Sequence, residues 1–306
     1  MASENYLEET GLIKSLKETI AEEKKLAEYK GDDRVISSEE MQEELKRKGS
    51  LVVNGYDCGF PFLANKIGKL EPGNLITVTG FSGMGKTSIL TAMTVKLSEK
   101  GTPVLWFSYE NTAAQFFRKF DNVDLPLFYL PMSNKPYDLN WFVERVKEAI
   151  LKYDVKVIMI DHLHYILDLF QSRNASLDIG NLLRNLKILA VENELVIFLV
   201  AHTKQPKDFS EPDMGSIRDS SFIVQESDKV LAVHRIKGSI ERRSKVIILK
   251  DRDHGNVMGE YSEFVLNGDL LEEVPTHRQG ENMTAALNSR KEGERLRDAK
   301  LTEGLK

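Results

Sequence analysis

The sequence predicts an α/β fold with a mostly parallel central sheet, flanked by helices and extended by antiparallel edge strands. Apolar runs alternate with helical patterns between residues 75 and 200, which is typical of a parallel sheet covered on both faces. The later apolar runs are separated only by short polar loops, such as residues 237–239. Such short connections indicate hairpins that continue the sheet at one edge.

Each expected element follows from its local pattern. Strands rich in apolar and β-branched residues are expected at 75–79, 103–108, 155–160, 195–200, 229–234 and 244–249. Helices are expected between the early strands, at 88–97, 112–120, 140–152 and 176–192. A buried strand is a short apolar run, whereas a helix needs a longer periodic one.

The composition divides the chain into three parts. Residues 1–50 are dominated by Glu and Lys and are expected to form a charged helical extension with a linker helix. Residues 51–274 form the globular body, and residues 275–306 lose the apolar pattern and are expected to be a polar mobile tail with at most a short helix.

Two helices are expected in the charged extension. Leu12, Leu16 and Ile20 recur every four residues and give one narrow apolar stripe. A second helix is expected to start at Ser37 or Ser38 with a Ser37–Glu40 capping box, and to stop at Gly49. The stripe is either part of a solvated charged helix or a surface made for a partner, such as a neighbouring subunit.

The composition also excludes several protein classes. The 306 residues are 41% hydrophobic and 29% charged, as in ordinary soluble proteins, and contain neither a membrane-spanning run nor a signal-peptide core. The single cysteine, Cys58, excludes an internal disulfide and fits a reducing cytoplasm. The net charge of −5 gives no global nucleic-acid footprint, although basic loops can line a channel in an acidic protein.

The most specific motif is a phosphate-binding loop, GFSGMGKT, at residues 80–87. It lies between an expected strand and an expected helix, which is the context that such a loop requires. Its glycines let backbone N–H groups surround phosphates at a helix N-terminus. Lys86 would reach the β- and γ-phosphates, and Thr87 would place its hydroxyl on Mg²⁺. The motif therefore predicts binding of a nucleoside triphosphate.

Two further strands end in carboxylates. Asp161 closes the strand near residues 155–160 and can hold Mg²⁺ through water, an interpretation that depends on the upstream phosphate loop. Glu110 follows the strand near residues 103–108 and is either the general base or a surface residue that caps the next helix.

Two later strand ends carry basic groups. His202 ends a buried strand and either senses the γ-phosphate or is structural. A basic segment with Lys204 and Lys207 follows it and is either functional or a solvated linker. Lys250 and Arg252 follow the last strand, in an exposed turn or in reach of a neighbour's γ-phosphate.

The order of these motifs resembles the core of DnaB-type replicative helicases, and above all phage helicase-primase and Twinkle-like members, which have His at the third strand end. The segment 59–73 before the first strand is also similar to that family. The resemblance covers about residues 50–274 and implies a RecA-like P-loop NTPase core. The expected helix near 38–48 stands where the family has a linker helix that docks onto the adjacent subunit.

The resemblance also implies a role for individual residues. The nucleotide contacts it implies are Ser82, Gly83, Met84, Gly85, Lys86, Thr87, Ser88, Arg235, Gln225 and Phe264. It makes Glu110 the general base and His202 the γ-phosphate sensor. Thr87 and Asp161 would hold Mg²⁺, and the expected cofactors are thus ATP and Mg²⁺.

Other residues are implied to act outside the chain's own nucleotide site. Lys250 and Arg252 would enter the next subunit's site, with Arg252 as the arginine finger. The DNA-binding positions implied by the resemblance are Lys204, Lys207, Arg173 and Arg218. The family's Asp-Leu-Arg-x-Ser-Gly stretch is changed at residues 216–221, where its first Asp and final Gly are absent.

The main hypothesis is an ATP-driven ring helicase, expected to be a hexamer, that translocates on single-stranded DNA at a replication fork. A cytoplasmic location is expected, which is the host cytoplasm for a phage protein, with no membrane partner. No primase fits before residue 50, so a separate primase or loader is an expected partner. One alternative is a RecA-like recombinase or mediator that forms filaments on DNA. Another is a nucleotide-switched loading or binding factor.

Overall fold

The computed structural model describes residues 22–49, 54–121, 123–135, 139–163, 175–203, 211–217, 220–236, 242–267 and 270–275. The contacts divide the chain into two units, Met1–Val53 and Asn54–Lys306, and each is described by itself. The expected apolar stripe at Leu12, Leu16 and Ile20 lies outside the described residues, as does almost all of the expected tail.

The first unit contains helix α3 (Ser38–Arg47), which begins and ends as its sequence predicts. The Ser37 hydroxyl accepts a hydrogen bond from the Glu40 N–H at 3.1 Å. The Glu40 carboxylate pairs with Arg34 at 3.3 Å, so only one half of the expected capping box forms. Gly49, just beyond the helix, has a φ of 68°, which glycine adopts without strain.

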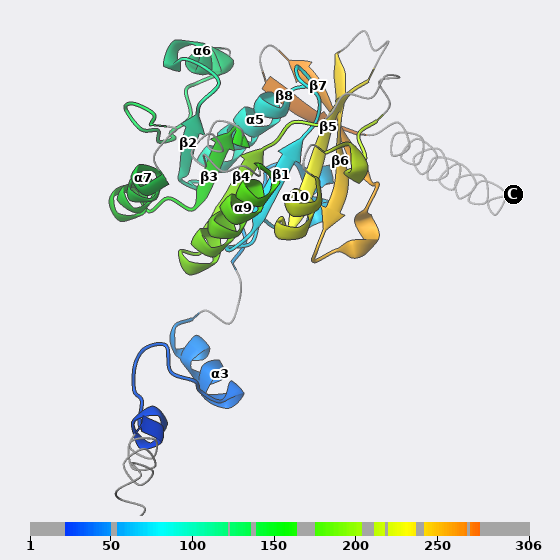
Figure 1. Cartoon of the computed structure of the whole chain (residues 1–306). Helices are drawn as coiled ribbons and strands as arrows, with labels where there is room; N and C mark the ends of the chain where they lie inside the picture. The colour runs from blue at the N-terminus through cyan, green and yellow to red at the C-terminus, as the bar shows by residue number, and fades with distance from the viewer. Residues whose placement is uncertain are drawn as a thin grey trace, which may run out of the picture. The chain divides into compact units, whose positions relative to one another are not determined.

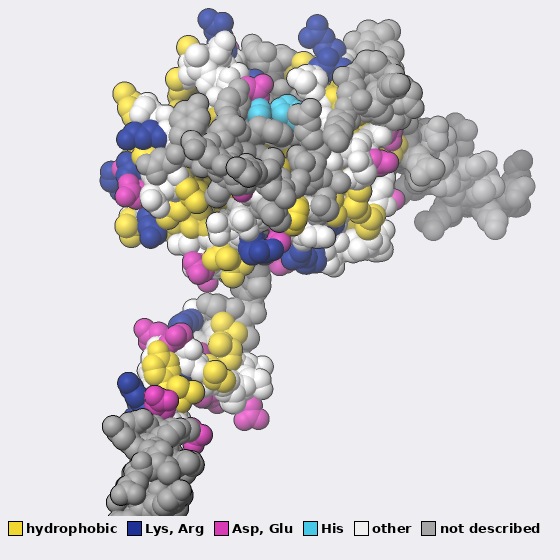
Figure 2. Space-filling view, viewed as in Figure 1, with side chains coloured by type: hydrophobic (Ala, Val, Ile, Leu, Met, Phe, Trp, Pro, Cys, Tyr) yellow, Lys and Arg dark blue, Asp and Glu magenta, His cyan; other side chains and the backbone are white. Residues whose placement is uncertain are grey.

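Apolar side chains lie at the surface of this first unit (Figure 2). Val35 is fully exposed, and Met41 on α3 is about half exposed. Helix α3 has no buried residue, so its folding within this unit gains little from apolar burial. An apolar surface of this kind can pack against another protein surface.

The second unit is built on an eight-stranded sheet with the order β2-β3-β4-β1-β5-β6-β7-β8 (Figure 1). The strands are β1 (Leu75–Thr79), β2 (Val104–Ser108), β3 (Val157–Asp161), β4 (Val196–Val200), β5 (Lys229–Arg235), β6 (Arg243–Asp251), β7 (Tyr261–Asn267) and β8 (Leu270–Val274). Neighbours from β2 to β5 pair in parallel, and the pairs from β5 to β8 are antiparallel. The predicted fold class is confirmed, with the added strands β7 and β8 at the antiparallel edge.

Helices cover both faces of the sheet. One face carries α4 (Pro61–Ile67), α5 (Lys86–Glu99), α6 (Ala113–Phe117) and the 3-10 turn η1 (Arg118–Phe120). The other carries α7 (Leu139–Tyr153), α9 (Ala175–Glu192) and α10 (Ser220–Glu226). Two short turns, η2 (Met214–Ser216) and η3 (Gly255–Val257), complete the described elements. Among these helices, none has the length and apolar content that a membrane crossing would require.

Alternating strand side chains supply two separate cores. Val157 and Met159 of β3 pack with α5, whereas Ile158 and Ile160 pack with α7 and α9. Successive side chains of a strand point to opposite faces, and a strand covered on both faces is therefore apolar throughout. This explains why the parallel strands are recognisable in the sequence as continuous apolar runs.

The start of the phosphate loop is packed directly against β5. Gly80 has a φ of 142°, and a Cβ atom there would lie 2.4 Å from the carbonyl oxygen of Val233. Gly80→Ala is therefore expected to lower the free energy of unfolding by more than about 2 kcal/mol, because strain and a backbone clash add. Urea unfolding followed by circular dichroism measures this loss.

Gly101 is the matched control for this prediction. It also has a positive φ, 72°, but a Cβ atom there would meet nothing within 4 Å. Gly101→Ala is expected to cost about 1 kcal/mol, from backbone strain alone. Equal losses for the two variants would contradict the close approach of Gly80 to β5.

Candidate nucleotide-binding site

The glycine-rich loop joins β1 to α5 and forms one side of a pocket. Helix α5 begins at Lys86, and its N-cap residue Gly85 has a φ of 99°. A glycine in this conformation lets the loop backbone turn sharply at the helix N-terminus, where anions bind. The pocket has a volume of about 240 Å³ and is lined by Ser82, Gly83, Gly85, Lys86, Thr87, Ser88, Glu110, Asn111, Lys119, His202 and Arg235.

Lys86 points back into the loop that precedes it. Its ammonium donates to the carbonyl oxygens of Gly80 and Phe81, at 2.9 and 3.0 Å, and lies 3.2 Å from Nδ1 of His202. Burial lowers the pKa of Lys86 to about 8, although the charges of Asp161 and Glu110 act in the opposite direction. The ammonium is thus held by neutral acceptors that a phosphate oxygen can replace.

Thr87 and Asp161 meet at the carboxyl ends of β1 and β3. The Thr87 hydroxyl donates to Oδ2 of Asp161 at 2.8 Å. Asp161 is fully buried, and its Oδ1 has no hydrogen-bond partner among the described residues. Burial raises the pKa of Asp161 to about 6, and the Thr87 hydrogen bond partly offsets this rise. A hydroxyl and an unpartnered carboxylate oxygen are ligands that suit Mg²⁺.

Glu110, His162 and His202 gather beside this pair. Their side-chain ligand atoms lie within 4.8 Å of one another, and the two imidazole rings are 4.5 Å apart and nearly perpendicular. One water that makes hydrogen bonds of about 2.8 Å spans such separations. Two ligands of one zinc ion, at about 2.1 Å each, lie at most about 4.2 Å apart. The group therefore suits a water molecule at least as well as a metal ion.

Three residues near the site were not anticipated from the sequence. His162 follows Asp161 directly, and its proximity to Glu110 results from the pairing of β2 with β3. Asn111 and Lys119 also line the pocket. The positive charge of Lys119 lowers the pKa of Asp161, which indicates that this lysine faces the same acidic group. Only the polar residue after a strand end could have indicated His162, and that signal is weak.

Two of the expected nucleotide contacts lie away from the pocket. Phe264 in β7 is fully buried and packs edge-to-face on Phe60, with ring centroids 5.1 Å apart. It is a core residue, so the structure gives it no face on which a base could stack. Gln225 lies in α10, where its carbonyl oxygen accepts from Arg252 at 2.9 Å, and it does not line the pocket. Arg235, at the end of β5, does line it.

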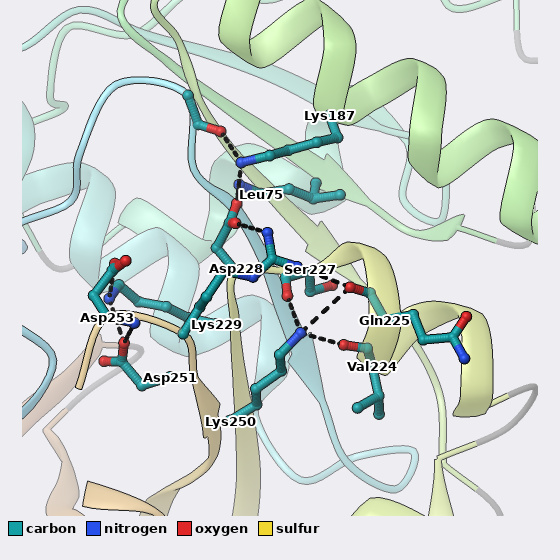
Figure 3. A network of polar contacts seen from close by, with 12 residues as sticks. Leu75, Lys187, Val224, Gln225, Ser227, Asp228, Lys229, Lys250, Asp251 and Asp253 are labelled. Carbon is teal, nitrogen blue, oxygen red and sulfur yellow. Dashed lines mark hydrogen bonds and ion pairs between the residues drawn. The ribbon is translucent and has the colours of Figure 1, made fainter. Parts of the chain in front are cut away.

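Lys250 and Arg252 lie at the opposite end of the parallel strands from the pocket (Figure 3). Strand β6 is antiparallel to β5, with Arg235 opposite Ser244 and Lys229 opposite Asp251. The six steps along β5, each about 3.3 Å, separate these ends by about 20 Å. Arg252 donates to Asp228 at 2.8 Å, and the Lys250 ammonium contacts the end of α10. Neither side chain belongs to the chain's own pocket.

The four expected DNA-binding residues, Arg173, Lys204, Lys207 and Arg218, lie outside the described residues. Met84 belongs to the phosphate loop but does not line the pocket. The structure thus brings together the loop, Glu110, Asp161, His202 and Arg235.

Comparisons with known proteins agree with this site. Residues 130–265 match the family described as "DnaB-like helicase C terminal domain". A "Probable plasmid replicative DNA helicase" of Chlamydia psittaci is 23% identical over 248 residues, which cover 69% of this chain and 54% of that protein. A "Replicative DNA helicase DnaB" of Helicobacter pylori (strain ATCC 700392 / 26695) is 25% identical over 224 residues, 63% of this chain and 46% of that protein.

The solved structure of an ATPase domain shares the fold. It superimposes with a TM-score of 0.66 at 16% identity, covering 79% of this chain and 99% of that one. The RecA-like core that the motif order implied is therefore confirmed. The chain spans about half the length of the curated relatives it matches.

Proposed function

We propose that this chain, which is related to the DnaB-like helicases, is the ATPase subunit of a ring that moves along single-stranded DNA and separates the strands of a duplex. One observation carries this proposal. The groups that can bind and cleave a triphosphate lie in one pocket, whereas Arg252 lies at the other end of the sheet, about half exposed. Such an arginine can complete a site only on another molecule.

In the proposed site, Lys86 exchanges its two loop carbonyl partners for phosphate oxygens of ATP. Thr87 and Asp161 would hold Mg²⁺, since they offer a hydroxyl and an unpartnered buried carboxylate oxygen. Bound Mg²⁺ would neutralise charge on the β- and γ-phosphates. Arg235 and Lys119 extend the positive lining of the pocket towards the nucleotide.

Hydrolysis then requires a positioned water. Glu110 takes a proton from it as general base, and His162 and His202 hold it from the other side. His202 also lies 3.2 Å from the Lys86 ammonium, so the loss of the γ-phosphate changes the surroundings of both. His202 stands two residues before Lys204, and movement of that segment would transmit hydrolysis to DNA through Lys204 and Lys207.

Assembly supplies the remaining group. Arg252 of one copy would contact the γ-phosphate in the next copy's pocket, and the exposed apolar side chains of the first unit would dock onto a neighbour. A ring of six copies, a separate primase or loader, and a place in the cytoplasm of a bacterium or of a phage's host complete the proposal.

The test is the release of an end-labelled strand from a forked duplex. The protein with ATP and Mg²⁺ is expected to release the strand and to hydrolyse ATP faster when single-stranded DNA is added, because DNA phosphates contact the moving loops. Lys86→Ala is the control and is expected to do neither. Labelling each strand end in turn gives the direction of movement.

Two outcomes would contradict the proposal. Turnover that single-stranded DNA does not stimulate would favour a nucleotide-switched loading factor. Open filaments on DNA in electron micrographs, with no closed rings and no strand release, would favour a recombinase or mediator.

A further inference from the structure

We infer that Asp228 is the positioning residue of Arg252 and that, of the two cations in the Lys250-x-Arg252 pair, only Arg252 presents its charge to a bound anion. This inference rests on the proposed function, in which Arg252 serves the site of a neighbouring copy. It concerns what aims the guanidinium.

Asp228 and α10 hold the guanidinium at two points (Figure 3). Nη1 of Arg252 donates to Oδ1 of Asp228 at 2.8 Å, and Nη2 donates to the carbonyl oxygen of Gln225 at 2.9 Å. The two residues are also joined through the backbone, since the Arg252 N–H donates to the Asp228 carbonyl at 2.9 Å. Two bonds to one planar group fix its plane as well as its position.

The Asp228 carboxylate is itself held firmly. Its Oδ2 accepts from the N–H of Leu75 at 2.8 Å and from the ammonium of Lys187 at 2.6 Å. Lys187 also donates to the carbonyl oxygen of Gly73 at 2.8 Å. The Asp228 side chain is only 5% exposed, so a buried carboxylate with two cations on it has little freedom to turn. Its other oxygen is left to orient Arg252.

Arg252 keeps donors for a ligand. A guanidinium has five N–H donors, and two are used among the described residues. The side chain is 49% exposed, which leaves the remaining edge open to an anion. A planar fork with free donors matches the geometry of a phosphate.

Lys250 is in the opposite situation. Its ammonium contacts the carbonyl oxygens of Val224, Gln225 and Ser227 at the end of α10. An ammonium has three donors, so these three acceptors use all of them. Lys250 therefore satisfies the last carbonyls of the helix and supports the Gln225 carbonyl that Arg252 also uses.

Asp228→Asn tests the inference in the assembled protein on single-stranded DNA. Removing the charge from one strong hydrogen bond is expected to lower kcat for ATP hydrolysis about 10- to 100-fold. The KM for ATP and the affinity for labelled ADP are expected to stay within about twofold, since the chain's own pocket lies at the other end of β5. A general loss of folding would change all three.

Two further variants separate positioning from a structural role. Glu226→Gln removes a neighbouring carboxylate that pairs with Arg184 at 3.2 Å and is expected to leave kcat unchanged. Asp228→Asn is expected to have no further effect on kcat when Arg252→Ala is already present, because the positioned group is gone. Should Asp228→Asn unfold, Asp228→Asn with Lys187→Met restores the charge balance, and the same loss of kcat is expected.

The outcomes distinguish this inference from the proposed function. Full kcat in Asp228→Asn, together with a large loss in Arg252→Ala, would overturn the inference alone. An additional loss of kcat from Asp228→Asn on the Arg252→Ala background would also overturn it. Full kcat in Arg252→Ala would instead overturn the shared site of the proposed function.

Discussion

Arg252→Ala is expected to lower DNA-stimulated ATP hydrolysis of the assembled protein by about 10³- to 10⁵-fold, the range for an arginine that stabilises charge on a transferring phosphoryl group. The pocket of the same chain should still bind nucleotide, because Arg252 lies at the opposite end of the sheet from the phosphate loop. Phosphate release at protein concentrations that give the full oligomer, checked by light scattering, measures the loss. Arg184→Ala, in the exposed pair with Glu226, is the matched control and should keep full activity.

Mixing two inactive variants tests whether Arg252 acts on another copy. Arg252→Ala keeps the phosphate loop intact, and Lys86→Ala keeps Arg252 intact. Mixed oligomers contain some interfaces with a functional pocket from one chain and a functional arginine from its neighbour. Partial recovery of hydrolysis is therefore expected. No recovery in oligomers shown to be mixed would indicate that each chain needs both residues for itself.

Glu110→Gln is expected to lower kcat about 10²- to 10⁴-fold, because a positioned general base typically contributes that much. Glu110 lines the pocket and lies within 4.8 Å of the imidazole nitrogens of His162 and His202. The amide keeps the size and a hydrogen-bonding oxygen but cannot take the proton from water. Single-turnover hydrolysis with radiolabelled ATP measures the chemical step, and binding of labelled ATP should be retained.

Glu144 on α7 provides the control for this second prediction. Its side chain is 68% exposed and does not line the pocket, so Glu144→Gln should hydrolyse ATP at the normal rate. An unchanged kcat in Glu110→Gln would mean that this carboxylate is not the base, as would a loss explained entirely by weaker ATP binding.

Much of the fold was predictable because its signals are local. A strand buried on both faces must be apolar throughout, and β1 occupies residues 75–79 as its pattern predicts. The other predicted parallel strands agree to within two residues at each end. Strands β7 and β8 were missed because their side chains are only partly buried, and a half-buried strand at a sheet edge has a weaker apolar pattern.

The nucleotide site shows the same division. The loop at 80–87 binds through consecutive backbone groups, so its motif is contained in one short segment. The acid and base groups come from different strands, and their meeting depends on the order β2-β3-β4-β1. His162 and Lys119 carry no motif and were found only when the strands and η1 were placed around the pocket. Phe264 was predicted to stack on a base, and its burial against Phe60 decided otherwise.

By itself, the sequence determined that this protein binds a triphosphate on a parallel sheet, since glycine conformation, helix N-termini and apolar runs act within a few residues of one another. The tertiary structure alone decided which charged groups face each other. It placed Arg252 beyond its own pocket because β6 runs antiparallel to β5, and it joined Arg252 to Asp228 and Lys250 to the end of α10. Ion pairs form between residues that the folding of the sheet brings together, and no spacing along the chain specifies them.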